Sequence, residues 1–129
     1  MSSRVGLPDY TLPSLGAITL MEKGARVLVW TSVNNAVVTV YTVPAGKVAY
    51  LLTLFYSAYN ASTTSRDRFI IYVKYDTNIW EIIDETVQPG GFTANIVTGG
   101  IVRLAQGEQI ILQAGTYIYL TASLMIIEI

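Results

Sequence analysis

The segment from Val40 to Ser62, VYTVPAGKVAYLLTLFYSAYNAS, contains two apolar runs joined by a Pro-Ala-Gly corner. Its apolar residues follow a period of two rather than the three-and-four spacing of a helix, which predicts β-strands. Pro44 fixes φ and Gly46 permits a positive φ, so the corner predicts a tight turn. The second run is apolar on both faces, whereas a half-exposed strand has one polar face. The segment therefore predicts a strand-turn-strand unit that buries one face inside the domain and part of the other against copies of the chain.

The rest of the chain after residue 24 repeats this pattern of short apolar runs between turn signals. Asn34-Asn35, Asp76-Thr77-Asn78 and Pro89-Gly90-Gly91 are turn signals of this kind. Eight or nine short strands at intervals of roughly 8–12 residues are typical of an all-β sandwich or barrel. The sequence thus predicts a single antiparallel β-sandwich domain over residues 25–129, after an extended N-terminal arm over residues 1–24. The expected strands are 27–33, 37–43, 47–59, 68–75, 79–83, 92–97, 101–104, 109–114 and 117–129.

Alternation assigns faces to the two longest expected strands. In the strand after the corner, we place Tyr50, Leu52, Leu54 and Tyr56 with Val48 on one face and Leu51, Phe55 and Tyr59 on the other. The last strand has a clean apolar face from Ile118 to Ile126, while its other face contains tyrosines and a methionine, which are enriched at protein interfaces. The predicted subunit interface therefore comprises Leu51, Phe55, Tyr59, Tyr117, Tyr119 and Met125. The alternative is that the N-terminal arm or a neighbouring loop covers this face.

Charge is scarce, and this favours self-association. Charged residues make up 13% of the 129 residues, against about 25% in an average domain. A monomer with so few charges covers its surface poorly, which indicates buried subunit contacts. The net charge of -1 and the lack of a basic stripe argue against nucleic acid as a partner. The apolar stretch from Val48 to Tyr59 is too short to span a membrane as a helix, so we expect a soluble protein without a membrane partner.

The sequence offers little for catalysis. It contains no histidine and no cysteine, which excludes Ser-His and Cys-His catalysis and a histidine-based metal site. Two carboxylates suffice for a glycosidase, so Glu81, Asp84 and Glu85 form an alternative hydrolase site, although Glu81 and Glu85 are expected to face solvent. Asp76, Asn78 and Asp84 offer oxygen ligands for calcium, but their spacing matches no calcium loop, and turn chemistry is the preferred interpretation. We predict a non-enzymatic protein with no cofactor and no bound metal.

Aromatic residues support a third hypothesis. Trp30, Trp80 and nine tyrosines could form a platform on which sugar rings stack, as in a carbohydrate- or receptor-binding module. That function predicts an exposed tryptophan beside polar groups on loops at one end of the domain. Aromatic residues in a β-sandwich are more often core or interface residues. Asn60-Ala61-Ser62 is also a formal glycosylation sequence.

Several motifs resemble those of small virion proteins of phages and other prokaryotic viruses. They are VYTVPAGKVAYLLTL, then Asn-Ala-Ser, RFIIYV, GGIVRLAQGEQIILQAG and a terminal SLMIIEI. The Val-Pro-Ala-Gly-Lys corner before a long strand, the Leu104 to Glu108 turn before the penultimate strand, and the Ile127-Glu128-Ile129 ending are shared features. The late layout is also similar to trimeric tumour-necrosis-factor/C1q proteins. The resemblance covers residues 37–129.

The resemblance implies a jelly-roll sandwich that forms a trimer and serves as a capsid decoration or tail component, with a capsid or tail protein as a further partner. It implies a place in the virion, after a soluble stage in the host cytoplasm, and the composition suggests a virus of a hot habitat. It brings no catalytic residues with it. The N-terminal arm, which its prolines keep extended, would then dock on a neighbouring subunit or on the capsid.

Overall fold

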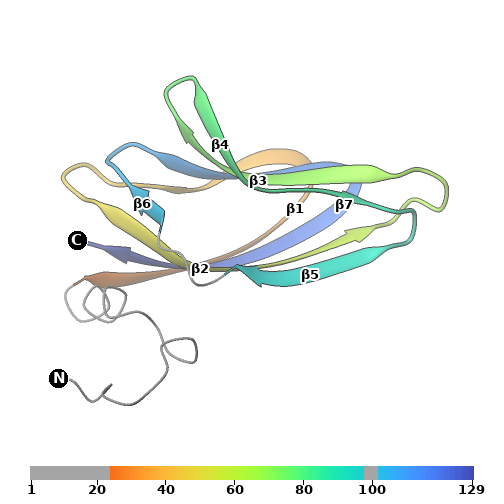
Figure 1. Cartoon of the computed structure of the whole chain (residues 1–129), viewed down its shortest axis with the longest axis horizontal. Coiled ribbons are helices and arrows are strands. Elements are labelled where there is room, and N and C mark those ends of the chain that lie inside the picture. Colours follow the sequence, from red (N-terminus) through yellow and green to blue (C-terminus); the bar gives the residue numbers. More distant parts are fainter. Residues whose placement is uncertain (1–23, 98–101) are drawn as a thin grey trace, which may run out of the picture.

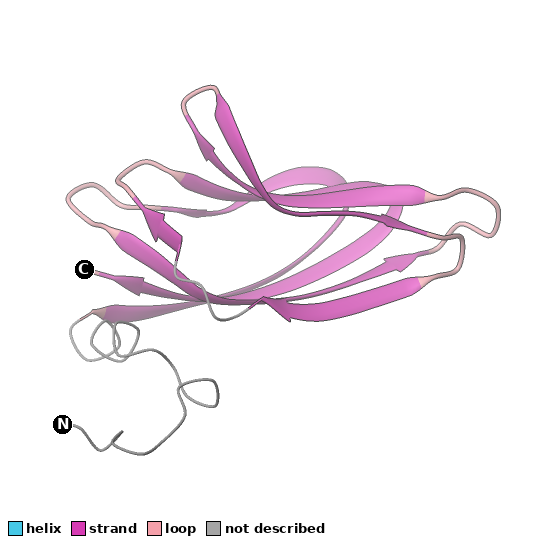
Figure 2. Cartoon of the chain, viewed as in Figure 1, coloured by secondary structure: helices cyan, strands magenta, loops and turns pink. Residues whose placement is uncertain are grey.

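The computed structural model describes residues 24–97 and 102–129, and every regular element in them is a β-strand (Figure 2). The strands are β1 (Ala25–Thr42), β2 (Ala49–Asn60), β3 (Asp67–Tyr75), β4 (Asn78–Val87), β5 (Phe92–Val97), β6 (Val102–Leu104) and β7 (Gln109–Glu128). The all-β prediction is confirmed. Within these ranges no helix has the length and apolar character to cross a bilayer. The predicted arm, except Gly24, and the break expected between the strands 92–97 and 101–104 lie outside the described residues.

The strands form one antiparallel sheet whose centre is β7. The order is β4-β3-β7-β2-β5, with β1 pairing β7 and β6 pairing β2. The first part of β7, as far as Ala114, pairs with β3, and the part from Ile118 onward pairs with β2. β1 follows β7 along both parts. Because the two parts of β7 have different neighbours, the sheet curls, and β3 and β4 come to lie over β2 and β5 (Figure 1).

Side chains hold the bend of β7 between these two parts. The Asp67 carboxylate accepts hydrogen bonds from the backbone N–H of Tyr117 at 2.7 Å and of Arg68 at 2.8 Å. A Cβ atom at position 115 would overlap that carboxylate, so glycine is required there. On the other side of β7, the Asn34 amide donates to the Ile118 carbonyl at 2.8 Å. The bend is therefore fixed by polar groups from both neighbouring strands.

The hydrophobic core fills the concave side of the curled sheet. The predicted inner face of the last strand is confirmed, since Ile118, Leu120, Ala122, Leu124 and Ile126 are all buried. Burying one large apolar side chain stabilises a fold by about 1.5–3 kcal/mol, so these layers account for much of the stability. Beside them in the sheet lie Leu54, Tyr56 and Ala58 of β2. The same core cluster contains Phe69, Ile71 and Val73 of β3, and Ile110 and Leu112 of β7 itself.

The predicted turns between strands form as expected. Gly46 has a φ of 77° in the turn closed by the hydrogen bond from the Lys47 N–H to the Pro44 carbonyl. Gly107, with a φ of 84°, occupies the same position in the turn from Ala105 to Glu108. The two turns are adjacent, because the Gly46 N–H donates to the Gln106 side chain at 2.8 Å. Tyr75 and Asn78 are paired across the predicted β3–β4 hairpin.

Two predicted breaks are wrong, and the described chain has seven strands instead of eight or nine. Asn34-Asn35 does not reverse the chain: Asn35 takes a φ of 48° and forms a bulge inside β1. Gly115 likewise lies inside β7, at its bend. Asn, Asp and Gly favour positive φ or close approach in bulges as well as in turns, so the residue types alone do not separate the two.

The predicted faces of β2 are wrong before Thr53. A register shift between Leu51 and Thr53 against β7 places one extra residue on β2. One extra residue moves every preceding side chain to the opposite face. Ala49 and Leu51 therefore lie in the core, while Leu52 and Tyr50 pack with Ile127 and Met125 on the convex side. From Leu54 onward the predicted faces are correct.

The loop from β2 to β3 is organised by one buried amide. Asn60 is fully buried; its side-chain nitrogen donates to the carbonyls of Ser65 at 2.8 Å and Val87 at 2.9 Å. Its oxygen accepts from the Ser62 N–H at 2.9 Å. Asn60 thereby ties the loop to the end of β4. With these hydrogen bonds the amide is enclosed in the fold and not available as the glycosylation acceptor that its sequence context suggests.

We predict that Asn60→Ala lowers the free energy of unfolding by about 3 kcal/mol, because it leaves buried backbone groups without partners. Urea unfolding followed by far-ultraviolet circular dichroism measures this. Asn78→Ala, at the exposed start of β4, is the matched control and should change stability by less than about 0.5 kcal/mol. Equal effects of the two substitutions would contradict the role of Asn60.

Candidate interaction surface

The convex side of β1, β7, β2 and β5 is a continuous surface in which residues of the four strands lie in rows. Directly paired residues of antiparallel strands point to the same face. Two rows cross all of these strands with large apolar side chains in them: Trp30–Ser123–Phe55–Ile96 and Asn34–Tyr119–Tyr59–Phe92. A small polar row, Ser32–Thr121–Ser57–Ala94, lies between them. We call this surface the outer face.

Large apolar side chains are exposed across the outer face. Phe92 is 68% exposed, Tyr119 56%, Ile96 54%, Tyr59 46% and Phe55 40%. We call these five residues the aromatic patch. Single exposed apolar residues are common on protein surfaces, but large apolar residues that gather on one face mark an interaction site. The register places Tyr59 between Tyr119 and Phe92, and Phe55 beside Ile96, so the patch consists of two groups on one face with the small polar row between them.

Charged residues are segregated away from this face. The rows described above contain none, and neither does the following row of Leu28, Met125 and Thr53; the row after that has an arginine at each end, Arg26 and Arg103. Residues 66–85, which form β3, most of β4 and the loop before β3, contain eight charged residues. One half of the curled sheet is therefore well solvated, while the other half presents apolar and small polar groups to its surroundings.

Five of the six predicted interface residues lie on this side of the sheet. Phe55, Tyr59, Tyr117 and Tyr119 are exposed, and Met125 is half-buried against Ile127. Leu51 is not on the surface: it is 4% exposed in the core, because of the register shift in β2. The alternation of side chains within each of the strands β2 and β7 was sufficient to predict these five residues. Their function as a subunit interface remains a prediction.

The interface prediction missed residues on neighbouring strands. Phe92 and Ile96 of β5, and Leu28 and Trp30 of β1, belong to the same surface. The sequence signal for Leu28 and Trp30 was present, since both alternate with the half-buried Val27 and Val29. Phe92 and Ile96 join the patch only through the pairing of β5 with β2, which the alternation of one strand does not reveal.

A shallow hollow of about 230 Å³ lies on the outer face between β1 and β7. Ser32, Asn34, Tyr119 and Thr121 contribute to its lining. The Ser32 and Thr121 hydroxyl oxygens are 3.0 Å apart and share a hydrogen bond. The hollow thus combines hydroxyl and amide groups with an exposed tyrosine ring, one residue pair away from Trp30 along β1.

The three predicted hydrolase carboxylates do not face a common cleft. The Asp84 carboxylate forms a two-pronged ion pair with the Arg68 guanidinium, at 2.7 and 2.8 Å. Glu85 is on the opposite face of β4 and accepts a hydrogen bond from the Tyr56 hydroxyl at 2.8 Å and from Thr93 at 3.2 Å. The expectation that Glu85 faces solvent is wrong, because Glu85 pairs with the buried Phe69 and shares its inward direction. Glu81 is exposed, as expected, and takes part in neither of these contacts.

The Glu85 hydrogen bonds join β4 to β2 and β5, which are not paired with it through their backbones. A second tyrosine is used in the same way, since the Tyr41 hydroxyl donates to Glu128 at 2.6 Å. Burial first, and then the hydrogen bond to Glu85, raise the pKa of Tyr56 to about 12. Burial and Glu128 also raise the pKa of Tyr41 above its ordinary value. Both carboxylates therefore serve as acceptors for buried phenols.

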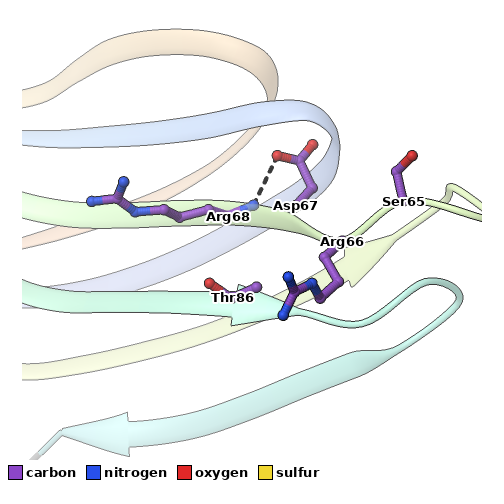
Figure 3. Close-up of a pocket in the computed structure, with 5 residues that line it drawn as sticks. All are labelled: Ser65, Arg66, Asp67, Arg68 and Thr86. Atoms are coloured by element: carbon purple, nitrogen blue, oxygen red, sulfur yellow. Dashed lines mark hydrogen bonds between the residues drawn. The ribbon is translucent and has the colours of Figure 1, made fainter.

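An open polar hollow of about 550 Å³ lies where β3 begins, lined by Ser65, Arg66, Asp67, Arg68 and Thr86 (Figure 3). In the view, Asp67 points to the opposite side of the strand from Arg66. Two of the three charged groups in the lining are already engaged: Asp67 holds the β7 bend, and Arg68 pairs with Asp84. The hollow thus results mainly from the contacts that hold the start of β3 against β7 and β4.

The remaining predicted ligand residues are dispersed. Asp76 and Asn78 are at the exposed β3–β4 hairpin, remote in the sheet from the Asp84–Arg68 pair. The described ranges contain no group of three or more carboxylates placed to hold a metal ion. Trp30 and Trp80 are both exposed, at 72% and 50%, but each lies within a strand and not on a loop.

The raised pKa values give a prediction for alkaline pH. A tyrosine with a pKa near 10 when unfolded and about 12 when folded stabilises the fold in its neutral form. Its contribution is complete below pH 10 and is lost as the pH rises from 10 toward 12. We expect Tyr56→Phe to lower stability at pH 7 by about 1–2 kcal/mol and to reduce the further loss above pH 10. Urea unfolding between pH 7 and 11 measures both effects.

Tyr75→Phe, at the exposed hairpin, is the control for removal of a phenol. It should leave the stability at pH 7 almost unchanged. A Tyr56→Phe variant whose stability falls above pH 10 as steeply as that of the unchanged protein would show that Tyr56 does not contribute to the alkaline sensitivity.

The comparisons with known proteins assign no family. No protein-family model matches the chain, and no curated protein sequence matches it. The resemblance to virion proteins therefore remains an expectation based on sequence motifs.

Proposed function

We propose that the protein is a non-enzymatic structural subunit that assembles with copies of itself through the outer face. The observation that supports this most is the contrast between the two halves of the sheet. The exposed aromatic patch spans three strands on the half with few charges, while residues 66–85 hold eight charged residues on the other. Apolar interfaces enriched in aromatic residues and depleted in charge are typical of permanent assemblies.

The finer parts of this proposal come from the motif resemblance. A jelly-roll sandwich is the form that we infer for the curled sheet, supported by the way β3 and β4 cover β2 and β5. We infer a trimer as the closed assembly and a virion, as capsid decoration or tail component, as its place. A capsid or tail protein would be its further partner. These inferences rest on sequence motifs, whereas the self-association rests on the exposed patch.

Phe55→Lys tests the self-association, because it places a charge within the aromatic patch, directly opposite Ile96. We expect the association to weaken at least a hundredfold, since an ammonium group buried at an interface has no partner there. Light scattering across a dilution series measures the mass in solution. The unchanged protein should keep the mass of an oligomer, three times 14.1 kDa for a trimer, at concentrations where the variant is monomeric.

Ile79→Lys is the matched control, since Ile79 is 57% exposed but lies on β4, outside the outer face. It should leave the mass unchanged. If the unchanged protein is a monomer at every concentration, the proposal fails. If both variants dissociate the oligomer equally, the assembly uses a different surface.

A carbohydrate- or receptor-binding function is the second candidate, favoured by the hollow between Ser32 and Thr121. Exposed Tyr119 and Trp30 lie beside its hydroxyl groups, and sugar sites combine aromatic faces with a few polar groups. Unlike the first candidate, this one requires the tryptophan to be accessible in the assembled protein.

Tryptophan fluorescence separates the two candidates. If Trp30 remains free, acrylamide should quench the emission of the unchanged protein strongly, and soluble oligosaccharides should shift it. Trp80→Phe isolates the Trp30 signal. For the self-associating protein that we propose, we expect acrylamide quenching of Trp30 to fall as the protein associates. Millimolar oligosaccharides should then leave the emission unchanged. A saturable shift with one sugar, abolished by Tyr119→Ala, would favour the binding module.

A further inference from the structure

The described sheet has free edges at β1, β4 and β5 with β6, and β1 is the longest. Proteins protect free edges with short strands, charges, prolines or bulges, because unpaired N–H and C=O groups attract other strands. β5 has six residues and β6 three. β4 contains Glu81, Asp84 and Glu85, and its pairing with β3 includes a register shift. β1, by contrast, has 18 residues with one charge, Arg26, and neither proline nor glycine.

The two parts of β1 differ in how regularly they pair with β7. Register shifts against β7 occur at Asn34/Ala36 and at Thr39/Tyr41, so the later part of the strand is bulged. From Ala25 to Asn34 the register with β7 is unbroken. The first part of β1 is therefore a nearly uncharged edge without a bulge, the arrangement that accepts an additional strand most readily.

The same stretch has the two most exposed large apolar side chains among those described. Leu28 is 74% exposed and Trp30 is 72% exposed, and both point to the outer face. They are separated by one residue, Val29, which points the other way and is half-buried. An added strand would cover both side chains and supply hydrogen-bond partners to the edge at the same time.

We propose that this edge pairs antiparallel with the same edge of a second copy, across a two-fold axis at Val29. The proposal deepens the proposed self-association and rests on it. In this register Leu28 lies opposite the partner's Trp30 and Trp30 opposite the partner's Leu28, so the two exposed side chains cover each other. On the concave side Val27 lies opposite the partner's Thr31. Such a contact uses one surface twice, as in a two-fold interface.

A second copy fits this edge better than an unrelated strand because the segment is complementary to itself. Reversing the sequence Val27–Thr31 about Val29 sets apolar residues opposite apolar residues on the outer face and β-branched residues opposite each other on the concave side. The single charge, Arg26, faces the partner's Ser32 and never its own copy, so no like charges meet. Cross-strand pairs of this kind each stabilise a sheet, whereas facing like charges destabilise it.

The two-fold edge contact is distinct from the contact that closes a trimer. The aromatic patch is formed by β2, β5 and β7, while the edge contact belongs to β1. Together the two contacts would link trimers into larger arrays, and the outer faces of paired subunits would be continuous.

Cysteine cross-linking tests the proposal, and the chain has no cysteine of its own. In Val29→Cys the introduced residue would lie opposite its own copy. Directly opposed residues of antiparallel strands have Cα atoms about 4.5–5.5 Å apart, within the range of about 4.4–6.8 Å that a disulfide spans. We expect mild oxidation to convert most of the Val29→Cys protein into a covalent dimer, visible in a non-reducing gel.

Val27→Cys and Thr31→Cys are the matched controls, because both residues lie on the same face of β1. In the proposed register each is about 14 Å from its own copy, so neither variant alone should cross-link. A mixture of the two variants should, because Val27 lies opposite the partner's Thr31. Circular dichroism of each variant shows whether it is folded.

The outcomes separate this proposal from the function on which it rests. An oligomer by light scattering without cross-linking of Val29→Cys overturns the edge contact and leaves self-association standing. A monomer at every concentration overturns both, including the case in which another segment of the chain covers the edge. Equal cross-linking of all three single variants overturns the register at Val29.

Discussion

The bend of β7 between Ala114 and Ile118 determines the shape of the described sheet. Before the bend β7 pairs with β3, and after it β7 pairs with β2. The Asp67 carboxylate binds the Tyr117 N–H, and Gly115 leaves room for that carboxylate. Without the bend, β3 and β4 would continue away from β2 and β5, and the concave side would stay open. The burial of Phe69, Ile71 and Leu124 therefore depends on a few polar contacts at one point.

This dependence explains which parts of the fold the sequence predicts. Alternation from Ile118 to Ile126 identifies the inner face correctly, because a strand in regular register keeps its period of two. Turns with an unambiguous glycine, such as Pro44 to Lys47, are also predicted correctly. Asn34-Asn35, Gly115 and the extra residue near Leu52 are not, because bulges use the same residue types as turns. Whether such a residue reverses a strand or only bends it depends on the neighbouring strand.

The residues of the interaction surface also differ in whether the sequence alone predicts them. Phe55, Tyr59 and Tyr119 can be predicted, because each is an apolar residue on the face opposite a well-defined core face. Leu51 follows the same rule and is misplaced by one bulge. Phe92 and Ile96 join the patch through the pairing of β5 with β2, which connects Phe92 to Tyr59 and Ile96 to Phe55, residues far apart in the sequence. A sequence shows which residues of a strand point outward, whereas the topology determines which outward residues become neighbours.

The distribution of charge connects the fold to the proposed assembly. The chain has only 17 charged residues, eight basic and nine acidic, and eight of them lie in residues 66–85. If the molecule were monomeric, a more even distribution would cover both halves of the sheet with water-binding groups. Instead Asp84, Arg68 and Lys74 make the β3–β4 half compatible with solvent, while the half formed by β1, β7, β2 and β5 has almost no charge. Protection of the edges follows the same division, since β4 contains three carboxylates and the first part of β1 only one charge, Arg26. The face and the edge with the fewest charges both belong to one half of the molecule, and that half is where we expect other copies to bind.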